Sequence, residues 1–366
     1  MKMASKIFFT IITTAFLFTL PSNLWAGEKP ADIKKTTWND IFSDIVGRYP
    51  LPGIEAGDDS TGKISKIEIP KNWEFGISTK RFIASHTSYE FGDPDEPYTK
   101  PLSRLEFPVN TSWLNFDLRR TCPRWSIGTQ AGFSVNRNSN KFMKDSDWTS
   151  DENEDYLTNF SKSYCDVKSA FLIRADVDVN ISDWLRLPPS LEVRPLFAFQ
   201  FQRFAVMAHD GVQWNYGPNT TSSMEGNAIS FRQDWYTYLI GLRGAYKLDL
   251  NKDLTIKLNG EADWGPALGY NEDHHILRGD RFSYEKTSGG ALYFLTGLEM
   301  TVSKTITLGI GVDYLWISTS GTHKLVDPTP TDANGNMLPA INQSWSDGVH
   351  AWSDQLGLMV RLSYAF

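Results

Sequence analysis

The sequence predicts an all-β fold, a roughly ten-stranded antiparallel transmembrane β-barrel with long extracellular loops. Apolar and polar residues alternate with a period of two over many segments, as they do along β-strands. No segment after Ala26 approaches the roughly 18 uninterrupted apolar residues that a membrane-spanning helix needs. Short connections alternate with long polar ones, which is typical of barrels whose turns face the periplasm and whose loops face outward.

The last predicted strand shows the alternation most clearly. Leu358, Val360 and Leu362 share one face, which suits lipid, whereas Arg361 lies among small residues on the other face, which suits a wet lumen. A soluble β-sandwich would also alternate, but it explains neither the terminal Phe366 nor the unequal connections. About ten segments follow the pattern, near residues 73–91, 102–118, 125–142, 166–182, 189–208, 229–248, 253–270, 287–302, 305–320 and 350–366.

The connections between these segments fall into two kinds. Residues 251–253 and 303–304 read as short periplasmic turns, whereas residues 143–165, 209–228 and 321–349 read as long polar outer loops. An even number of strands places both ends of the barrel in the periplasm. The net charge of −7 disfavours a nucleic-acid binder.

The N-terminal part has a different composition. A basic start, an apolar run from Ile7 to Leu20 and the small residue Ala26 predict a secretory signal peptide over residues 1–26. An uncleaved anchor is the alternative, but the apolar run is short for one. We expect residues 27–70 to form a periplasmic N-terminal extension and residues 71–366 to form the barrel. Cys122 falls in a predicted periplasmic turn and Cys165 near an outer loop, too far apart for a disulfide.

Two short motifs could carry chemistry. Asp145 and Asp147 stand two residues apart, so on extended backbone their carboxyl groups point the same way and can share a proton or polarise a water. Asp273 and His275 have the same spacing, and an Asp beside a His can orient the imidazole for general-base work. Both motifs fall at outer strand ends, where they could face each other across the barrel mouth.

Plainer interpretations of these motifs remain open. An EF-hand-like calcium loop beginning at Asp145 would need Gly at its sixth position and Glu at its twelfth, where Ser150 and Tyr156 stand. The acidic stretch could be a solvated loop. His274 and His275 could bind a metal, but no third ligand lies at motif spacing, so we expect no metal site.

Alternation provides a check on which way these side chains face. Asp273 and His275 fall on the lumen-facing positions of their strand. Strict alternation from Trp125 would instead turn Asp145 toward lipid. The active-site hypothesis therefore requires a bulge or twist between Asn136 and Lys144.

The chain resembles the omptins, the outer-membrane proteases of Gram-negative bacteria, from about Gly76 to Phe366. Asp145-Ser146-Asp147-Trp148 resembles the family's Asp-x-Asp-Trp motif, and Asp273-His274-His275 resembles its Asp-x-His motif. Residues 282–286 are similar to the stretch that follows the second motif, and residues 103–107 are similar to the second strand.

The resemblance implies a ten-stranded outer-membrane barrel that cleaves peptides at the cell surface. It implies that His275, held by Asp273, and the couple Asp145/Asp147 flank a water that attacks the scissile carbonyl without a covalent enzyme intermediate. Glu90 falls on the family's acidic substrate-pocket position. Asn271 occupies the second pocket position, which is acidic in the family, so a preference for basic residues is weakened.

The resemblance also implies lipopolysaccharide on the outer wall. Arg203 is similar to one lipid-A-binding position, and Arg232 could replace the other, which holds Asp234 here. Arg203 could equally be an interfacial residue that snorkels to headgroups. We expect a monomer with no cofactor other than lipopolysaccharide. A non-catalytic barrel serving as an adhesin or structural protein is the alternative function, and a diffusion pore is disfavoured because about ten strands leave a narrow lumen.

Overall fold

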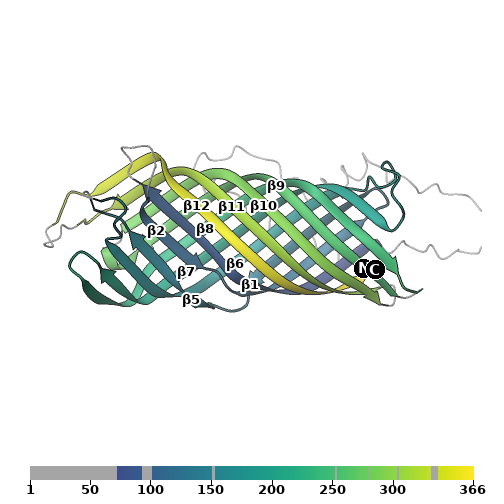
Figure 1. Cartoon of the computed structure of the whole chain (residues 1–366), viewed down its shortest axis with the longest axis horizontal. Helices are drawn as coiled ribbons and strands as arrows, with labels where there is room; N and C mark the ends of the chain where they lie inside the picture. The colour runs from purple at the N-terminus through teal and green to yellow at the C-terminus, as the bar shows by residue number, and fades with distance from the viewer. Residues whose placement is uncertain are drawn as a thin grey trace, which may run out of the picture. The chain divides into compact units, whose positions relative to one another are not determined.

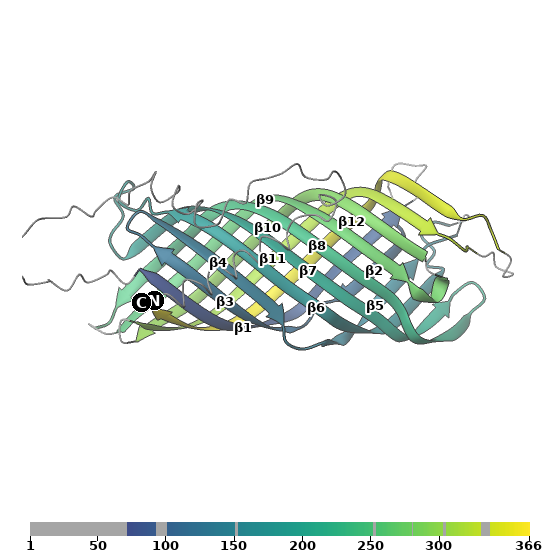
Figure 2. The ribbon, with the colours of Figure 1, turned by 180° about the vertical axis from the view of Figure 1, so that it is seen from behind.

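The computed structural model describes residues 72–92, 101–150, 153–251, 254–279, 281–302, 305–330 and 337–366; of Asn140, only the backbone is described. The chain divides into two units, Met1–Pro70 and Lys71–Phe366, and the described residues all belong to the second. The expected signal peptide and the expected extension over residues 27–70 lie outside the described residues. The second unit is an antiparallel β-barrel, seen from two sides in Figures 1 and 2. No helix in the described ranges is long and apolar enough to cross a membrane.

Twelve strands of the described residues occupy ten positions around the barrel, which confirms the predicted fold. β2 and β3 both pair with β1, one above the other, and β4 and β5 both pair with β6 in the same way. Pairing of β1 with β12 closes the ring. The strands are β1 (Trp73–Gly92), β2 (Pro101–Pro108), β3 (Ser112–Thr121), β4 (Trp125–Ser134), β5 (Asn138–Asp147), β6 (Asn159–Val179), β7 (Leu191–Asn215), β8 (Thr220–Asp249), β9 (Leu254–His275), β10 (Arg281–Val302), β11 (Ile306–Asp327) and β12 (Ile341–Ala365), and a 3-10 turn, η2, spans Ile276–Arg278.

The two ends of the barrel differ in their connections. Backbone hydrogen bonds of 3.3 and 2.9 Å join Trp73 to Phe366, so the first and last strands meet at one end, here called the terminal end. The connections before β4, β9 and β11 are short and lie at this end. The opposite end, here called the loop end, carries β2, β5 and η2, and Figure 2 shows β3 and β4 toward the terminal end and β2 and β5 toward the loop end.

The segments predicted to be long outer loops also contain the ends of the strands that they connect. β5 and β6 extend into residues 143–165, β7 and β8 extend into residues 209–228, and β11 and β12 extend into residues 321–349. These extensions are polar on both faces in places, since a strand that leaves the lipid no longer needs an apolar outer face. The apolar–polar alternation that indicated the membrane-crossing strands is therefore missing where these strands continue beyond the lipid.

The barrel wall has an apolar outer face and a charged inner face. Leu358, Val360 and Leu362 are 45%, 61% and 52% exposed, whereas Arg361 between them turns inward. The Arg361 guanidinium contacts the Asp117 carboxylate of β3, which lies on the other side of β1, and is 2.6 Å from Glu74 Oε1. This arrangement confirms the alternation predicted for the last strand.

Ion pairs fill the lumen toward the terminal end. Arg174 Nη2 lies 2.5 Å from Glu261 Oε1 and 2.8 Å from Asp263 Oδ2, and all three side chains are buried. Arg243 continues the network by donating to Glu261 at 2.6 Å and to Asp178 at 2.7 Å. Farther along the barrel, the amides of Gln202 and Gln355 bond to each other at 2.8 and 2.9 Å from strands on opposite sides of the ring.

Candidate active site

The break between β4 and β5 re-aims the acidic stretch. Even-numbered residues of β4, such as Gly128, face inward, but beyond Val135–Arg137 the pairing with β6 shifts register between Asn138 and Phe142. Met143 is then 1% exposed and Phe142 is 49% exposed, so odd-numbered residues face the lumen. The irregularity required by the site hypothesis is present.

Asp145 and Asp147 thus lie together on the inner face of β5. Their partners across the strand pair are Leu105 and Ser103 of β2, and Ser103 Oγ lies 3.5 Å from Asp145 Oδ1. Burial, followed by the charge of Asp147, raises the pKa of Asp145 to about 7. Near neutral pH the two carboxyl groups can therefore hold one proton between them.

Asp273 and His275 project into the lumen from β9, as predicted. Asp273 is completely buried, and its Oδ1 lies 3.3 Å from His275 Nε2. Its other oxygen accepts a 2.6 Å hydrogen bond from the Tyr89 hydroxyl, which reaches across the lumen from β1. The Tyr89 hydrogen bond fixes one oxygen of the carboxyl group, and the other oxygen faces the imidazole without a hydrogen bond.

The electrostatics of this pair favour uncharged groups. Burial raises the pKa of Asp273, the Tyr89 hydrogen bond opposes the rise, and the charges of Glu285 and Asp145 add to it. Burial and the nearby cationic Arg278 and Arg281 lower the pKa of His275 to about 3. His275 is accordingly a neutral imidazole at neutral pH and can accept a proton. The charge of Asp145 contributes to the raised pKa of Asp273, so the two motifs interact electrostatically.

Aromatic rings form a floor beneath these groups. The Tyr89 ring stacks on Phe231 with a centroid distance of 5.5 Å, and Phe231 stacks on Phe107 at 4.2 Å. Thr87 of β1 bonds to Gln233 of β8 from the opposite side of the ring. The floor and the ion pairs below it separate the candidate site from the terminal end.

Glu90 does not join the inner cluster, which corrects its expected position. Ala84 has a left-handed φ of 48°, and the pairing of β1 with β12 shifts register between Ile83 and His86. After this bulge Tyr89 faces inward and Glu90 faces the outside of the wall. There Glu90 lies 2.6 Å from the Arg104 guanidinium and 3.6 Å from His350 Nδ1.

Asn271 does face the lumen, beside an acid that the sequence interpretation missed. Glu285 of β10 pairs directly with Asn271 and is 1% exposed. One Glu285 oxygen lies 3.0 Å from His323 Nδ1, while Glu285 Oε2 and both polar side-chain atoms of Asn271 are buried without a hydrogen-bond partner. Glu285 was missed because the predicted strand began at residue 287, although the alternation of Ser283, Glu285 and Thr287 could have extended it.

Arg203 and Arg232 lie on the outer wall, as expected, but each is paired with a carboxylate. Arg203 donates to both oxygens of Asp234 at 2.5 and 2.6 Å, and Arg232 Nη2 lies 2.7 Å from Glu272 Oε2. An anionic lipid group would therefore have to share these arginines with resident carboxylates.

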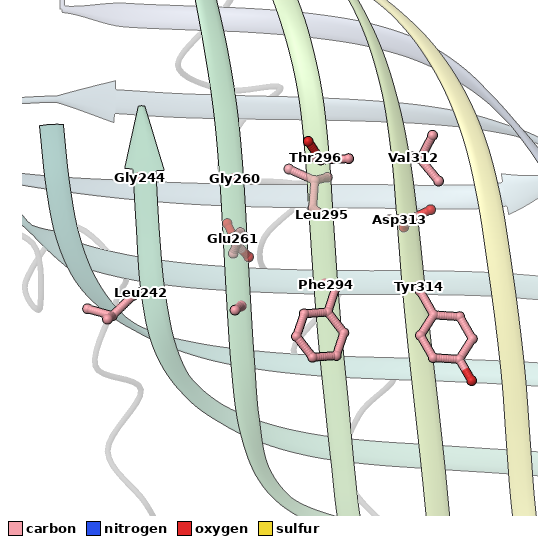
Figure 3. Close-up of a pocket in the computed structure, with 11 residues that line it drawn as sticks. Leu242, Gly244, Gly260, Glu261, Phe294, Leu295, Thr296, Val312, Asp313 and Tyr314 are labelled. Carbon is pink, nitrogen blue, oxygen red and sulfur yellow. The ribbon is translucent and has the colours of Figure 1, made fainter. Parts of the chain in front are cut away.

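One hollow lies in the barrel wall rather than at the candidate site. It has a volume of about 560 Å³ and is bordered by Phe294 and Tyr314, whose rings lie at the same level in Figure 3. Gly244 and Gly260 leave this space unfilled between β8 and β11. None of the four catalytic candidates lines it. Within the described ranges, no group of three or more His, Cys, Asp or Glu side chains could hold a metal ion.

Cys122 and Cys165 are both free cysteines, and Cys165 is buried. Cys122 lies in the turn after β3 and Cys165 lies on β6.

Comparison with solved structures identifies similar barrels. The outer-membrane protease OmpT from Escherichia coli is 16% identical, with a TM-score of 0.67, over 81% of this chain and 98% of that chain. The translocator domain of the autotransporter NalP from Neisseria meningitidis is 11% identical, with a TM-score of 0.33, over 90% and 97%. The outer-membrane protein OprG from Pseudomonas aeruginosa is 10% identical, with a TM-score of 0.36, over 80% and 95%.

Comparison by sequence places the chain in a family. No curated protein sequence matches it. The model of the omptin family matches residues 88–344, a span that holds both acidic motifs and most of the barrel. The resemblance carried by those motifs is confirmed: the chain belongs to the omptin family.

Proposed function

We propose that the protein is an outer-membrane endopeptidase that cleaves peptides or proteins at the cell surface. The supporting observation is the placement of Asp145, Asp147, Asp273 and His275 on the inner face of the loop end, with His275 neutral at neutral pH. Family membership and the OmpT-like fold agree with this proposal. The loop end faces the exterior, because the short turns lie at the opposite end.

In this proposal a water is bound between the two pairs. His275 takes a proton from the water as its oxygen attacks the scissile carbonyl carbon, and Asp273 holds the imidazole in place. The Asp145/Asp147 couple, with its shared proton, donates to and orients the reacting oxygens. When the peptide C–N bond breaks, the leaving amine takes the proton from His275. No bond forms between enzyme and substrate, which is the aspartic-type chemistry expected from the family resemblance.

Substrate side chains would enter beside Asn271. Its amide has no partner, and the neighbouring Glu285 oxygen is also free to accept a hydrogen bond. A buried polar atom without a partner is unfavourable, so a ligand donor that reaches these atoms gains binding energy. Glu90 is not part of this proposed substrate contact, because it lies on the outside of the wall.

We further propose that lipopolysaccharide contacts the outer wall at Arg203 and Arg232 and that the protein acts as a monomer. If lipopolysaccharide binds there, adding it should stimulate peptide cleavage. The carboxylates that pair with both arginines weaken this binding. Asp234→Asn should therefore increase the stimulation, because it releases Arg203.

The decisive experiment is cleavage of a peptide library by purified protein refolded with lipopolysaccharide, beside Asp145→Ala and His275→Ala. The barrel offers a matched control, because His86 and Asp354 form a second Asp–His pair on the outside of the wall, 3.4 Å apart. His86→Ala and Asp354→Ala should cleave like the wild type, while the two site variants should be inactive. Equal activity in all five proteins would rule out the proposed site.

If the refolded wild type cleaves no peptide, the result would favour the alternative function, a non-catalytic barrel. A diffusion pore is disfavoured by contacts that cross the described lumen, such as the Gln202–Gln355 pair and the Arg174 ion pairs. Such a pore would need these side chains to move aside.

A further inference from the structure

The proposed hydrolysis creates a negative charge in an acidic environment. When water attacks a peptide carbonyl, the carbonyl oxygen becomes an oxyanion, and stabilisation of that charge is often the largest single contribution to the rate. Three of the four proposed catalytic groups are carboxyl groups, and His275 is neutral at rest. A nearby cation that is not already neutralised would therefore have a large effect.

Arg281 is in position to supply this cation. It is the first residue of β10 and pairs directly with His275 of β9, so their side chains leave adjacent backbones on the same face. Ser283 and Glu285, two and four residues further on, are buried in the lumen, which places Arg281 on the inner face. Phe282 points the other way and stacks on His274 at a centroid distance of 4.1 Å.

The charge of Arg281 acts on both sides of the cleft. Its guanidinium interacts electrostatically with Asp147 of β5 and with Tyr89, the residue that bonds to Asp273. Burial and the neighbouring Arg278 lower the pKa of Arg281, and Asp327 and Asp147 oppose this. Asp327 Oδ1 accepts a hydrogen bond from the Thr329 backbone N–H at 3.2 Å, so this oxygen already has a partner other than Arg281.

Arg281 differs from the other inward-facing arginines in having no direct partner. Arg174, Arg243 and Arg361 each lie within 2.8 Å of a carboxylate oxygen. Arg281 makes no hydrogen bond and no ion pair within the part of the chain that the structure describes, although it is only partly exposed. Guanidinium groups carry five N–H donors, so an unpaired one at a reaction centre can bind a carbonyl oxygen.

We propose that Arg281 binds the carbonyl oxygen of the scissile peptide bond and stabilises the oxyanion that forms there. This inference rests on the proposed peptidase function. As the water oxygen bonds to the carbonyl carbon, its proton passes to His275 and the carbonyl π electrons move to oxygen, which accepts N–H donors of Arg281. Collapse restores the carbonyl, breaks the C–N bond and returns the proton to the leaving amine.

The test compares wild type, Arg281→Ala, Arg281→Lys and Arg124→Ala, all refolded with lipopolysaccharide. Arg124 is a matched control, since it lies in the turn before β4 at the terminal end. We expect kcat of Arg281→Ala to fall roughly 100- to 1,000-fold, as when other oxyanion donors are removed, with KM changed less than about threefold. Arg281→Lys should retain part of the activity, because it keeps the charge but loses the planar donor pair.

Chemical rescue separates a catalytic role from a structural one. Guanidinium ion at low millimolar concentration should restore cleavage by Arg281→Ala in a saturable way but should not restore cleavage by His275→Ala. Arg281→Ala and Arg281→Lys that both retain wild-type kcat would overturn this inference and leave the proposed function intact. A wild type that cleaves no peptide would overturn both.

Discussion

The two halves of the lumen treat buried charge in opposite ways. Toward the terminal end, the arginines and carboxylates around Arg174, Arg243 and Glu261 are mutually bonded. Toward the loop end, four acids, Asp145, Asp147, Asp273 and Glu285, share a small volume, and Arg281 has no direct ion pair. The difference indicates that the first half holds the barrel together, while the second half is kept ready for chemistry.

Physical chemistry explains why the two halves need each other. Burying unneutralised carboxyl groups is unfavourable, and their pKa values rise as a result. Such a site persists only where the surrounding structure is rigid enough to hold it. The cross-lumen bonds and the aromatic floor supply that rigidity directly beneath the acids.

The largest effect should come from the dyad. Asp273→Asn keeps the shape of the side chain but removes the carboxylate that orients His275, and we expect peptide cleavage to fall by roughly 10³- to 10⁴-fold. Unfolding by denaturant should be unchanged or shifted toward higher stability, because a buried acid is removed. A variant that loses stability along with activity would mean that Asp273 belongs to the structural half of the comparison.

The next largest effect should be on stability rather than on activity. Arg174→Ala leaves Glu261 and Asp263 buried without their cation, and we expect the free energy of unfolding to fall by about 3–5 kcal/mol. Denaturant titration in detergent, followed by tryptophan fluorescence, measures this. Arg203→Ala is the control, because its ion pair with Asp234 is partly exposed and should contribute about 1 kcal/mol or less. Similar losses in both variants would contradict a special role for the terminal-end network.

An intermediate effect should come from the link between the two sides of the cleft. Tyr89→Phe removes the 2.6 Å hydrogen bond to Asp273 while leaving the stacked ring in place. A hydrogen bond between uncharged groups contributes about 0.5–1.5 kcal/mol, so kcat should fall roughly 2- to 10-fold. Tyr314→Phe, which removes a similar hydrogen bond to Asp354 on the outside of the wall, should keep full activity.

The smallest effect should be on pH dependence. The exposed Arg278 lowers the pKa of both His275 and Asp145, behind burial as the main influence on each. Arg278→Gln removes this positive charge, so both pKa values should rise and both limbs of the pH–activity profile should move to higher pH. The shift should shrink at high salt, since an exposed charge is screened. A shift to lower pH would mean that Arg278 does not act through its charge.

How far the sequence predicted this molecule depends on strand regularity. On β9, alternation runs without a break, and Asp273, His275 and Asn271 all face inward as expected. On β1, the bulge at Ala84 inverts the pattern, so the expected position of Glu90 was wrong and Tyr89 was missed. A single left-handed residue cannot be read from alternation, because Ala is an ordinary strand residue in most settings.

On β5, the sequence established that an irregularity was required but not where it lies. The functional motif, rather than the strand pattern, demanded that Asp145 face inward. Contacts between residues far apart in the sequence, such as that of Glu285 with His323 on the neighbouring strand, depend on strand register, which a local pattern does not give.

The irregular segment between β4 and β5 divides the barrel wall into two parts with opposite alternation. Below Val135 the even-numbered residues face the lumen, and from Met143 onward the odd-numbered residues do. The inward-facing residues of β5 at the loop end are therefore odd-numbered, while those of β4 in the lipid-facing half remain even-numbered. For barrel engineering, a β5–β6 hairpin that is moved to another barrel should include residues 135–142. These residues contain the register shift that turns Asp145 and Asp147 inward.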